Sequence, residues 1–281
     1  MSHSTVTSLP DDAIEGLQAG TLAPYLGPGM LSLCGTCPVP ATPLALAQHL
    51  ASLSSVPGKI RHRSSAVAQF IENFKHRKTL VAYLDKAYAA VPAPSPLHRW
   101  LATLPAPLIV DTWYDGTLRS ALSGRTDWAE VQGLSQSEHF GTWTGWYTAA
   151  GDAQPDPIDA ATVLYKPWGG RLPASNYLCS DTDFVEVLTE IDIQTPIPAL
   201  VQARRTRLGF VFLGCRFDDQ LPRAFARQIL KRSRGPCYAV LPEAPTRMEA
   251  RFLDELRITR IALPLAQAAA VLTGAAALPV A

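Results

Sequence analysis

The chain has 281 residues, a length that suits one large α/β domain or two smaller ones. Hydrophobic residues make up 47% of it, which is enough to build a sizeable buried core. With 25 Lys and Arg against 24 Asp and Glu, the net charge is only +1, which excludes a broadly basic nucleic-acid binder and an acidic disordered chain.

The two ends of the chain suggest neither export nor membrane insertion. The first twenty residues lack a basic start followed by an apolar run, so we expect no secretory signal and a cytoplasmic protein. Residues 261–281 are uncharged and long enough to span a bilayer, but they contain Pro264, Gln267, Gly274 and Pro279. We therefore expect a strand end and a small-residue helix there, and no membrane partner. No pattern indicates a protein partner or an oligomeric state.

Between these ends, strand-like and helix-like segments alternate. Apolar runs of strand length indicate strands buried on both faces, as in a parallel sheet, at residues 22–26, 107–112, 163–166, 208–213, 237–241 and 258–263. Thr42 and Pro43 open a helix, and further helical patterns lie at residues 64–73, 78–89, 97–104, 181–190, 220–231 and 247–256. This alternation predicts an α/β fold with a doubly wound parallel sheet, whose ligand would lie beyond the C-terminal ends of the strands.

Aromatic residues are unevenly placed in this pattern. In the helices at 64–73 and 78–89 and just after them, we expect Phe70, Phe74, Val81, Leu84 and Tyr88 to be buried. Residues 124–159 have weak periodicity and many turn residues, which predicts a small irregular lobe inserted into a single domain of residues 1–281. Five of the six Trp lie between positions 113 and 168. We expect Trp128, Trp143 and Trp146 to form the core of this lobe, and Trp113 and Trp168 to form an aromatic wall that fills or lines a cleft.

A glycine turn follows the first apolar run. Gly27, Pro28 and Gly29 come directly after residues 22–26 and lead towards a helix. Glycines at such a turn let the backbone approach a pyrophosphate, which free N–H groups can bind. The turn lacks the full G-x-G-x-x-G spacing, so by itself it favours a tight turn without a ligand.

Four segments that follow one another along the chain strengthen the case that this turn binds a ligand. They are P-Y-L-G-P-G at 24–29, P-S-P-L-H-R-W-L with P-L-I-V-D-T-W-Y-D at 94–101 and 107–115, Y-K-P-W-G-G with D-T-D-F at 165–170 and 181–184, and F-L-G-C-R-F-D-D at 212–219. Together they resemble the sirtuin-like family of NAD-binding proteins in its shorter bacterial form. That family has G-A-G, T-N-Y-D, K-x-H-G and F-L-G-Y-S-L-D-D at the corresponding places.

The resemblance covers nearly the whole chain, from about residue 22 to about residue 264. It implies a Rossmann-like, sirtuin-type fold with NAD, ADP-ribose or a related nucleotide in the cleft. The positions that it carries over as nucleotide contacts are Gly27, Gly29, Thr112, Trp113, Asp115, Trp168, Gly169, Gly214, Cys215 and Asp218.

Two of these positions depart from the family pattern. In sirtuin-like enzymes the Asn of T-N-Y-D and the His of H-G act at the nicotinamide ribose, whereas this chain has Trp113 and Trp168 there. Indole is neither a base nor a useful hydrogen-bond acceptor, so we expect no deacylase or NAD-cleaving activity of the usual kind and assign no catalytic residue. The side chains that would have to substitute are Asp111, Asp115 and His139.

The five cysteines allow a second hypothesis. Cys34 and Cys37 form a C-x-x-C pair after the glycine turn, and Cys215 and Cys179 lie at two further segments of the resemblance. If the four converge on the cleft, their thiolates would suit an iron–sulfur cluster or zinc. Taken alone, the C-x-x-C pair is as compatible with two small apolar residues in a loop, and Cys237 is expected in the core.

Three functional hypotheses therefore remain open. The first is a catalytically altered sirtuin-like protein that binds a nucleotide, and the second is a metalloprotein that uses the same cleft. The third is an NAD glycohydrolase with non-standard catalytic residues, which the two Trp positions disfavour. The first rests on the retained glycine turn and L-G segment, and it is preferred because the fold that the resemblance implies favours a nucleotide.

Overall fold

A ten-stranded sheet forms the centre of the molecule. The computed structural model describes residues 4–190 and 196–275. Within them the strands of the main sheet lie in the order β1-β12-β11-β10-β2-β3-β7-β4-β5-β6. Their bounds are Thr5–Val6 (β1), Leu22–Leu26 (β2), Leu108–Asp111 (β3), Trp128–Gly133 (β4), Thr144–Thr148 (β5), Ala153–Gln154 (β6), Thr162–Lys166 (β7), Gly209–Leu213 (β10), Cys237–Val240 (β11) and Ile258–Ile261 (β12). A separate two-stranded sheet pairs β8 (Gly169–Gly170) with β9 (Asn176–Tyr177).

The strand order confirms the doubly wound sheet. From β2 the chain winds outward through β3 and β7 on one side, then returns to lie beside β2 as β10 and continues through β11 and β12. These strands pair in parallel, and all six apolar runs form the strands that were expected. This is the strand order of the dinucleotide-binding fold, in which the direction of winding reverses between the first and fourth strands. That point lies here between β2 and β10.

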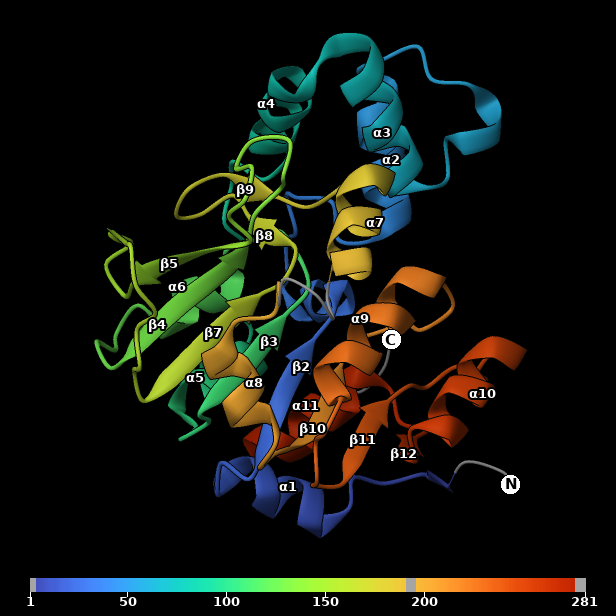
Figure 1. The fold of residues 1–281 in the computed structure, drawn as a ribbon. Helices are drawn as coiled ribbons and strands as arrows, with labels where there is room; N and C mark the ends of the chain where they lie inside the picture. Colours follow the sequence, from blue (N-terminus) through green and yellow to red (C-terminus); the bar gives the residue numbers. More distant parts are fainter. Residues whose placement is uncertain (1–3, 191–195, 276–281) are drawn as a thin grey trace.

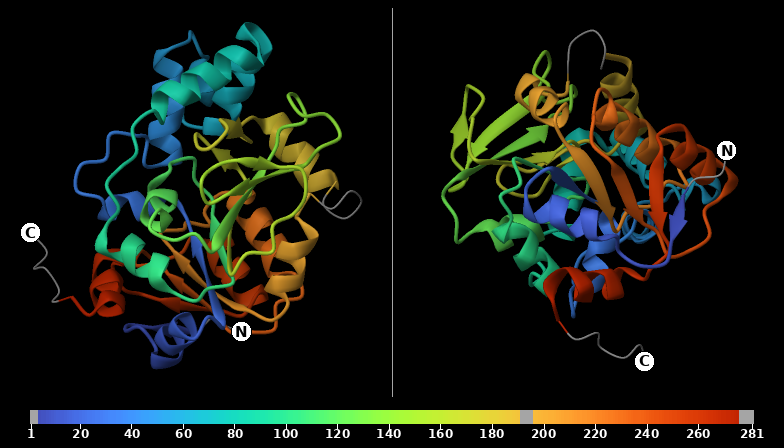
Figure 2. Two further views of the ribbon diagram at one scale, coloured as in Figure 1. Left: turned by 90° about the vertical axis from the view of Figure 1, so that its left-hand side faces the viewer. Right: turned by 90° about the horizontal axis from the view of Figure 1, so that it is seen from below.

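Helices cover both faces of the sheet (Figures 1 and 2). One face packs against α1 (Asp11–Gln18), α5 (Pro96–Thr103), α6 (Thr117–Leu122) and α11 (Leu265–Thr273). The other face packs against α8 (Ala199–Arg205), α9 (Gln220–Leu230) and α10 (Arg247–Glu255). Because apolar side chains from both faces of β2, β3 and β10 enter these two cores, the strands read as continuous apolar runs.

A helical lobe stands above the C-terminal ends of the strands (Figure 1). The lobe, residues 43–87, consists of α2 (Pro43–Ser52), the short turn η2 (Gly58–Ile60), α3 (Ser64–Lys75) and α4 (Arg77–Ala87). The turn η1 (Pro28–Leu33) leads to it from β2, and α7 (Asp181–Glu190) packs against α3. The sequence predicted these helices but not that they form a lobe of their own.

The burial expected for the lobe is met in part. Leu84 and Tyr88 are buried, and Phe70 and Val81 are half-buried. The expectation for Phe74 is wrong, because 72% of its side chain is exposed. Phe74 lies near the C-terminal end of α3 and stacks on Phe70, with ring centroids 4.5 Å apart.

Residues 124–159 continue the main sheet. Strand β4 pairs in parallel with β7, and the β5 and β6 strands follow antiparallel as its edge. This pairing buries Trp128 and Trp146, while Trp143 is only half-buried. The segment reads as irregular in the sequence because its strands are joined by a long β4–β5 loop and end in a two-residue edge strand.

The uncharged C-terminal segment begins as predicted, with β12 followed by α11, whose Ala268 and Leu272 are buried against the sheet. In the described ranges no helix is both long and apolar enough to cross a membrane. Residues 276–281 of the segment lie outside the described residues.

The helix α5 begins with a buried histidine. Ser95 caps it by accepting the N–H of His98, and the imidazole Nδ1 lies 2.7 Å from the Ser95 hydroxyl. Burial lowers the pKa of His98 to about 4, against the opposing effect of the Asp115 charge. His98 is therefore neutral in the folded protein at pH 7.

This histidine should make stability depend on pH. The folded-state pKa lies below the unfolded value of about 6.5, so its contribution is complete above pH 6.5 and is lost as the pH falls towards 4. Between pH 7 and pH 4, the wild type should lose up to about 3 kcal/mol more unfolding free energy than H98Q, whose Gln also suits this capping position. Urea unfolding at several pH values measures this difference, and equal pH slopes would contradict it.

Candidate functional site

Two turns meet where the winding of the sheet reverses. After β2 the Gly27 N–H donates to Leu213 O, and the Gly29 N–H donates to Gly214 O, both at 2.9 Å. Gly214 has a φ of +65°, which favours glycine, and a Cβ on Gly27 or Gly29 would come within 2.7 Å of Gly214 O. The three glycines thus allow the two turns to touch, and the N–H groups of Gly27 and Gly29 are used in this contact.

The outer side of this junction is open to solvent. Pro28 and Gly29 are partly exposed, and Ser32 is exposed, with its hydroxyl donating to Gly29 O. Asp218, which follows β10, is also exposed. Asp219 caps α9, because its side chain accepts from Gln220 N.

A buried lysine lies beneath the loop that follows β3. Lys166, at the end of β7, places its Nζ 2.6 Å from an Asp111 carboxylate oxygen, 2.6 Å from Trp113 O and 3.1 Å from Asp115 O. Thr112 donates its hydroxyl to Leu26 O, and the Asp115 carboxylate accepts from Thr117 N. Lys166 therefore holds the loop that carries three of the expected contact residues.

Burial sets the charges of this group. It raises the pKa of Asp111 to about 6, which the Lys166 charge partly offsets, so the carboxylate is ionised at pH 7. Burial alone would lower the pKa of Lys166, but the charges of Asp111, Asp115 and Glu130 outweigh it, and the net pKa is raised. Asp111 is therefore committed to an internal ion pair and is not available as a free base.

The two Trp side chains occupy the junction between lobe and sheet. Trp113 is 2% exposed and Trp168 is 8% exposed, and the ring of Tyr114 lies between them at centroid distances of 5.1 and 6.4 Å. The Trp113 indole N–H donates to Pro40 O at 2.8 Å. The surrounding rings are Tyr88, Tyr177, Phe184 and Phe225.

Of the two arrangements expected for these Trp side chains, filling or lining a cleft, the structure has the first. Trp113 and Trp168 do not line an open space; their rings fill the junction and join the lobe to the body in one apolar cluster. Within the described chain the Trp168 indole N–H is buried without an acceptor. Neither ring can accept a proton, and His139, one of the three substitutes considered, is exposed on the β4–β5 loop.

The cysteines do not gather at one place. Cys215 packs in the core under the β2 turn, with its thiol near Tyr25 O, whereas Cys34 and Cys179 belong to the apolar cluster of the lobe. Burial raises the pKa of both Cys179 and Cys215. Cys37 is half-buried and donates to Val39 O, and Cys237 is buried in the core as predicted.

The expected convergence of Cys34, Cys37, Cys179 and Cys215 is therefore not met. Among the described residues, which include all five cysteines, no three His, Cys, Asp or Glu side chains form a group that could hold a metal ion. The donor set does not fit an iron–sulfur cluster or zinc. Cys34 and Cys37 share the loop that follows η1, whereas Cys179 follows β9 and Cys215 follows β10.

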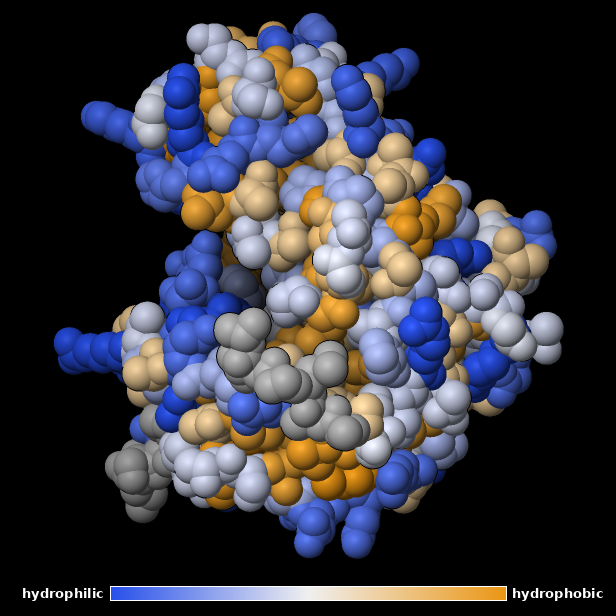
Figure 3. Space-filling view, turned by 180° about the vertical axis from the view of Figure 1, so that it is seen from behind, coloured by the Kyte–Doolittle hydropathy of each residue, from blue (hydrophilic) through white to orange (hydrophobic). Residues whose placement is uncertain are grey.

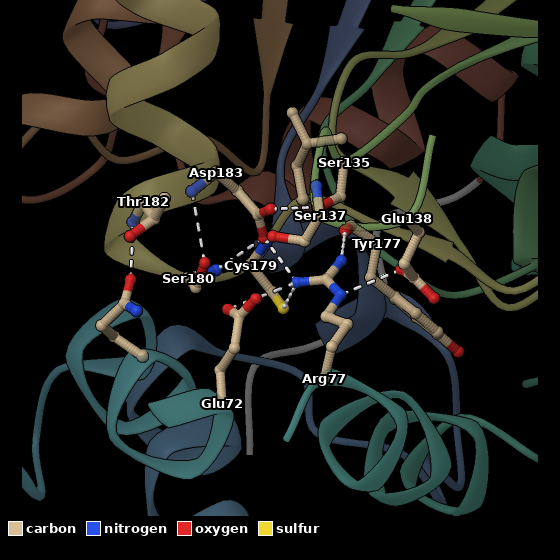
Figure 4. Close-up of polar contacts among 12 residues, drawn as sticks. Glu72, Arg77, Ser135, Ser137, Glu138, Tyr177, Cys179, Ser180, Thr182 and Asp183 are labelled. Carbon is tan, nitrogen blue, oxygen red and sulfur yellow. Dashed lines mark hydrogen bonds and ion pairs between the residues drawn. The ribbon is translucent and has the colours of Figure 1, made fainter. Parts of the chain in front are cut away.

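An arginine that the sequence analysis missed joins three parts of the molecule (Figure 4). Arg77, at the start of α4, lies 2.9 Å from Asp183 on α7 and 2.9 Å from Glu138 on the β4–β5 loop, and also donates to Tyr177 O. Its Nη1 is 3.9 Å from the Cys179 thiol. Burial opposes its charge, but Cys179, Asp183 and Glu138 outweigh burial and raise the pKa of Arg77.

Asp183 is the buried centre of this group. Its carboxylate accepts from Cys179 N and Ser180 N at 2.8 and 3.0 Å, and from the Ser135 hydroxyl. The side chain is fully buried, and Arg77 is the cation beside it. The sequence signal was the acidic start of α7, but nothing local indicated that its partner is 106 residues away.

Residues in two further segments of the resemblance have structural partners. Gly169 packs against the Asn176 backbone in the β8–β9 pair. Arg216, beside Gly214, is held by Glu243 at 2.9 Å and Glu249 at 3.1 Å, so its charge is already paired. The open part of the site is thus the outer face of the glycine turn.

Comparison with known families agrees with this architecture. A family model described as a SIR2-like domain matches residues 107–261, which is more than half of the chain and runs from β3 to β12. The matched region contains Trp113, Trp168 and Gly214 but not the glycine turn or the helical lobe. No curated protein matches the chain at a significant level.

Proposed function

We propose, from the premise that this chain belongs to the SIR2-like family, that it binds an adenine nucleotide such as ADP-ribose or NAD without cleaving it. The observation that carries the proposal is the strand order β12-β11-β10-β2-β3-β7 with glycine turns at the reversal between β2 and β10. Open α/β sheets bind their ligands at this point, beyond the C-terminal ends of the strands.

The outer face of the β2 turn suits the ADP part of such a ligand. Ser32 on η1 and Asp218 after β10 are both exposed, and a carboxylate can accept hydrogen bonds from ribose hydroxyls. The inner N–H groups of Gly27 and Gly29 are already bonded, so the phosphates would lie on the solvent side of the turn.

The nicotinamide end of NAD does not fit this structure equally well. Trp113 and Trp168 fill the place where the resemblance puts the reacting ribose, and both are buried. We therefore infer that ADP-ribose, which lacks nicotinamide, binds at least as tightly as NAD. Without a base in this place the glycosidic bond would not be cleaved.

Calorimetry with ADP-ribose and NAD tests the proposal. We expect saturable binding of ADP-ribose, NAD binding that is no tighter, and nicotinamide release no faster than in a blank without protein. Ser32→Trp, which places a large ring on the outer face of the turn, should weaken ADP-ribose binding at least tenfold.

Ser123→Trp is the matched control. Ser123 is also exposed, and its hydroxyl also donates at 2.8 Å to the carbonyl three residues earlier, but it lies at the C-terminal cap of α6. It should leave ADP-ribose binding unchanged. Absence of binding heat for both nucleotides, or equal losses in the two variants, would refute nucleotide binding at this turn; nicotinamide release above the blank would refute the lack of cleavage.

A further inference from the structure

The net charge of the chain hides a strong separation of charge. The helical lobe contains seven Lys and Arg but only two acidic residues, leaving 18 of the 25 Lys and Arg and 22 of the 24 Asp and Glu for the remainder. Both acidic residues of the lobe are paired, Glu72 with Arg77 at 3.6 Å and Asp85 with Arg171 at 3.5 Å. The exposed cations are Lys59, Arg61, Arg63, Lys75, Lys78 and Lys86.

Hydrogen bonds bring two groups of these cations close together. Arg61 Nε donates to Val56 O at 2.9 Å, and Lys75 Nζ donates to Leu53 O at 3.2 Å. The two carbonyls are three positions apart along the chain and therefore at most about 11 Å from each other, so the two charges lie within about 17 Å of each other. This distance corresponds to a few nucleotides of a single strand.

An exposed aromatic ring lies in the same region. Phe74 precedes Lys75 and leaves 72% of its side chain in solvent, although the ring is backed by Phe70. We call the surface formed by Lys59, Arg61, Arg63, Phe74, Lys75 and Lys78 the basic end of the lobe. Cations together with exposed aromatic rings are the pattern of surfaces that bind single-stranded nucleic acid.

The shape of the lobe favours a flexible partner. Figure 3 shows it as a rounded knob above the body, with hydrophilic side chains standing out from it. A flexible polyanion can follow a convex surface, whereas a folded acidic protein would need a matching concavity. A membrane would need a wider apolar face than the single ring of Phe74.

We propose that the basic end binds single-stranded nucleic acid, with its Lys and Arg contacting phosphates and Phe74 stacking on a base. The exclusion of a nucleic-acid partner from the net charge of +1 assumed an even distribution of charge, which the fold does not have. The body, which carries the excess of acidic residues, would keep the strand on the lobe.

Fluorescence anisotropy of a labelled 20-nucleotide oligothymidylate with the full chain tests this proposal. We expect saturable binding at 50 mM KCl that weakens as salt rises. K59Q/R61Q/R63Q should reduce the slope of log Kd against log salt by about 2, since each lost phosphate contact to a single strand accounts for about 0.7. F74A should weaken binding about tenfold and leave the slope unchanged, because stacking releases no counterions.

The matched control removes three exposed arginines at the opposite edge of the sheet. Arg207, Arg234 and Arg257 precede β10, β11 and β12, and R207Q/R234Q/R257Q changes the net charge by the same amount. It should leave affinity and slope near the wild-type values. Absence of oligonucleotide binding, an equal loss in the control, or binding only to anionic lipid vesicles or polyglutamate would overturn the proposal.

Discussion

Lys166→Met is expected to lower the free energy of unfolding by about 3–5 kcal/mol. The Lys166 Nζ lies 2.6 Å from an Asp111 carboxylate oxygen. Because both side chains are buried, water cannot solvate the carboxylate in place of the lysine. Its loss leaves a buried carboxylate without a cation and removes the donor to Trp113 O and Asp115 O. For a chain of this size, the melting temperature should fall by roughly 10 °C.

The ionisation of Asp111 supplies an internal check. Burial already raises its pKa to about 6, and removal of Lys166 raises it further. Because this folded-state pKa lies above the unfolded value, the loss in Lys166→Met should shrink as the pH falls from 7 to 5 and the folded carboxyl takes up a proton. K166M/D111N should regain much of the lost stability at pH 7.

Arg251→Met is the control for this variant, because Arg251 pairs with Glu255 on the surface and is 71% exposed. Its loss should cost less than about 1 kcal/mol. The comparison is made by urea unfolding of the wild type, Lys166→Met, K166M/D111N and Arg251→Met at pH 7 and pH 5. A loss below 1 kcal/mol in Lys166→Met would show that the buried ion pair is not needed for stability.

Arg77→Met should also lower the free energy of unfolding by about 3–5 kcal/mol, and it should weaken the attachment of the helical lobe to the rest of the molecule. Asp183 would keep its two backbone donors but lose the cation at 2.9 Å, and Glu138 and Tyr177 O would lose theirs. Since the ion pairs of Arg77 link α4 to α7 and to the β4–β5 loop, hydrogen exchange should increase most in residues 64–87.

Two further variants separate charge from geometry. R77K keeps the charge but cannot reach Asp183, Glu138 and Tyr177 O at once, so it should recover only part of the stability. R77M/D183N removes the unpaired carboxylate and should recover more than half of the loss. Arg63→Met, an exposed arginine of the same lobe, should change stability by less than about 0.5 kcal/mol. If hydrogen exchange in Arg77→Met increased equally over the whole chain, Arg77 would have no specific role in holding the lobe.

Much of the fold could be predicted from local sequence. The strands are buried on both faces, so their side chains form continuous apolar runs, and β2, β3, β7, β10, β11 and β12 were all found. Caps at Thr42 and Ser95 act within one helical turn, so the starts of α2 and α5 are also local properties. The family resemblance followed from the same segments.

The candidate site depended on contacts between distant residues. Whether Cys34, Cys179 and Cys215 meet, whether Trp113 and Trp168 line a cleft or fill it, and which cation faces Asp183 are decided by how the lobe packs on the sheet. Phe74 shows the same limit, since its apolar character predicts burial and only the end of α3 leaves it exposed.

By itself, then, the sequence determined the six central strands, the main helices of the lobe and the family. The tertiary structure decided that β4 pairs with β7, that residues 43–87 form a separate basic lobe, and that Arg77 and Lys166 hold buried carboxylates. The physical reason is range: periodicity and caps act over a few residues, whereas ion pairs and aromatic packing join side chains that lie 55 and 106 positions apart along the chain.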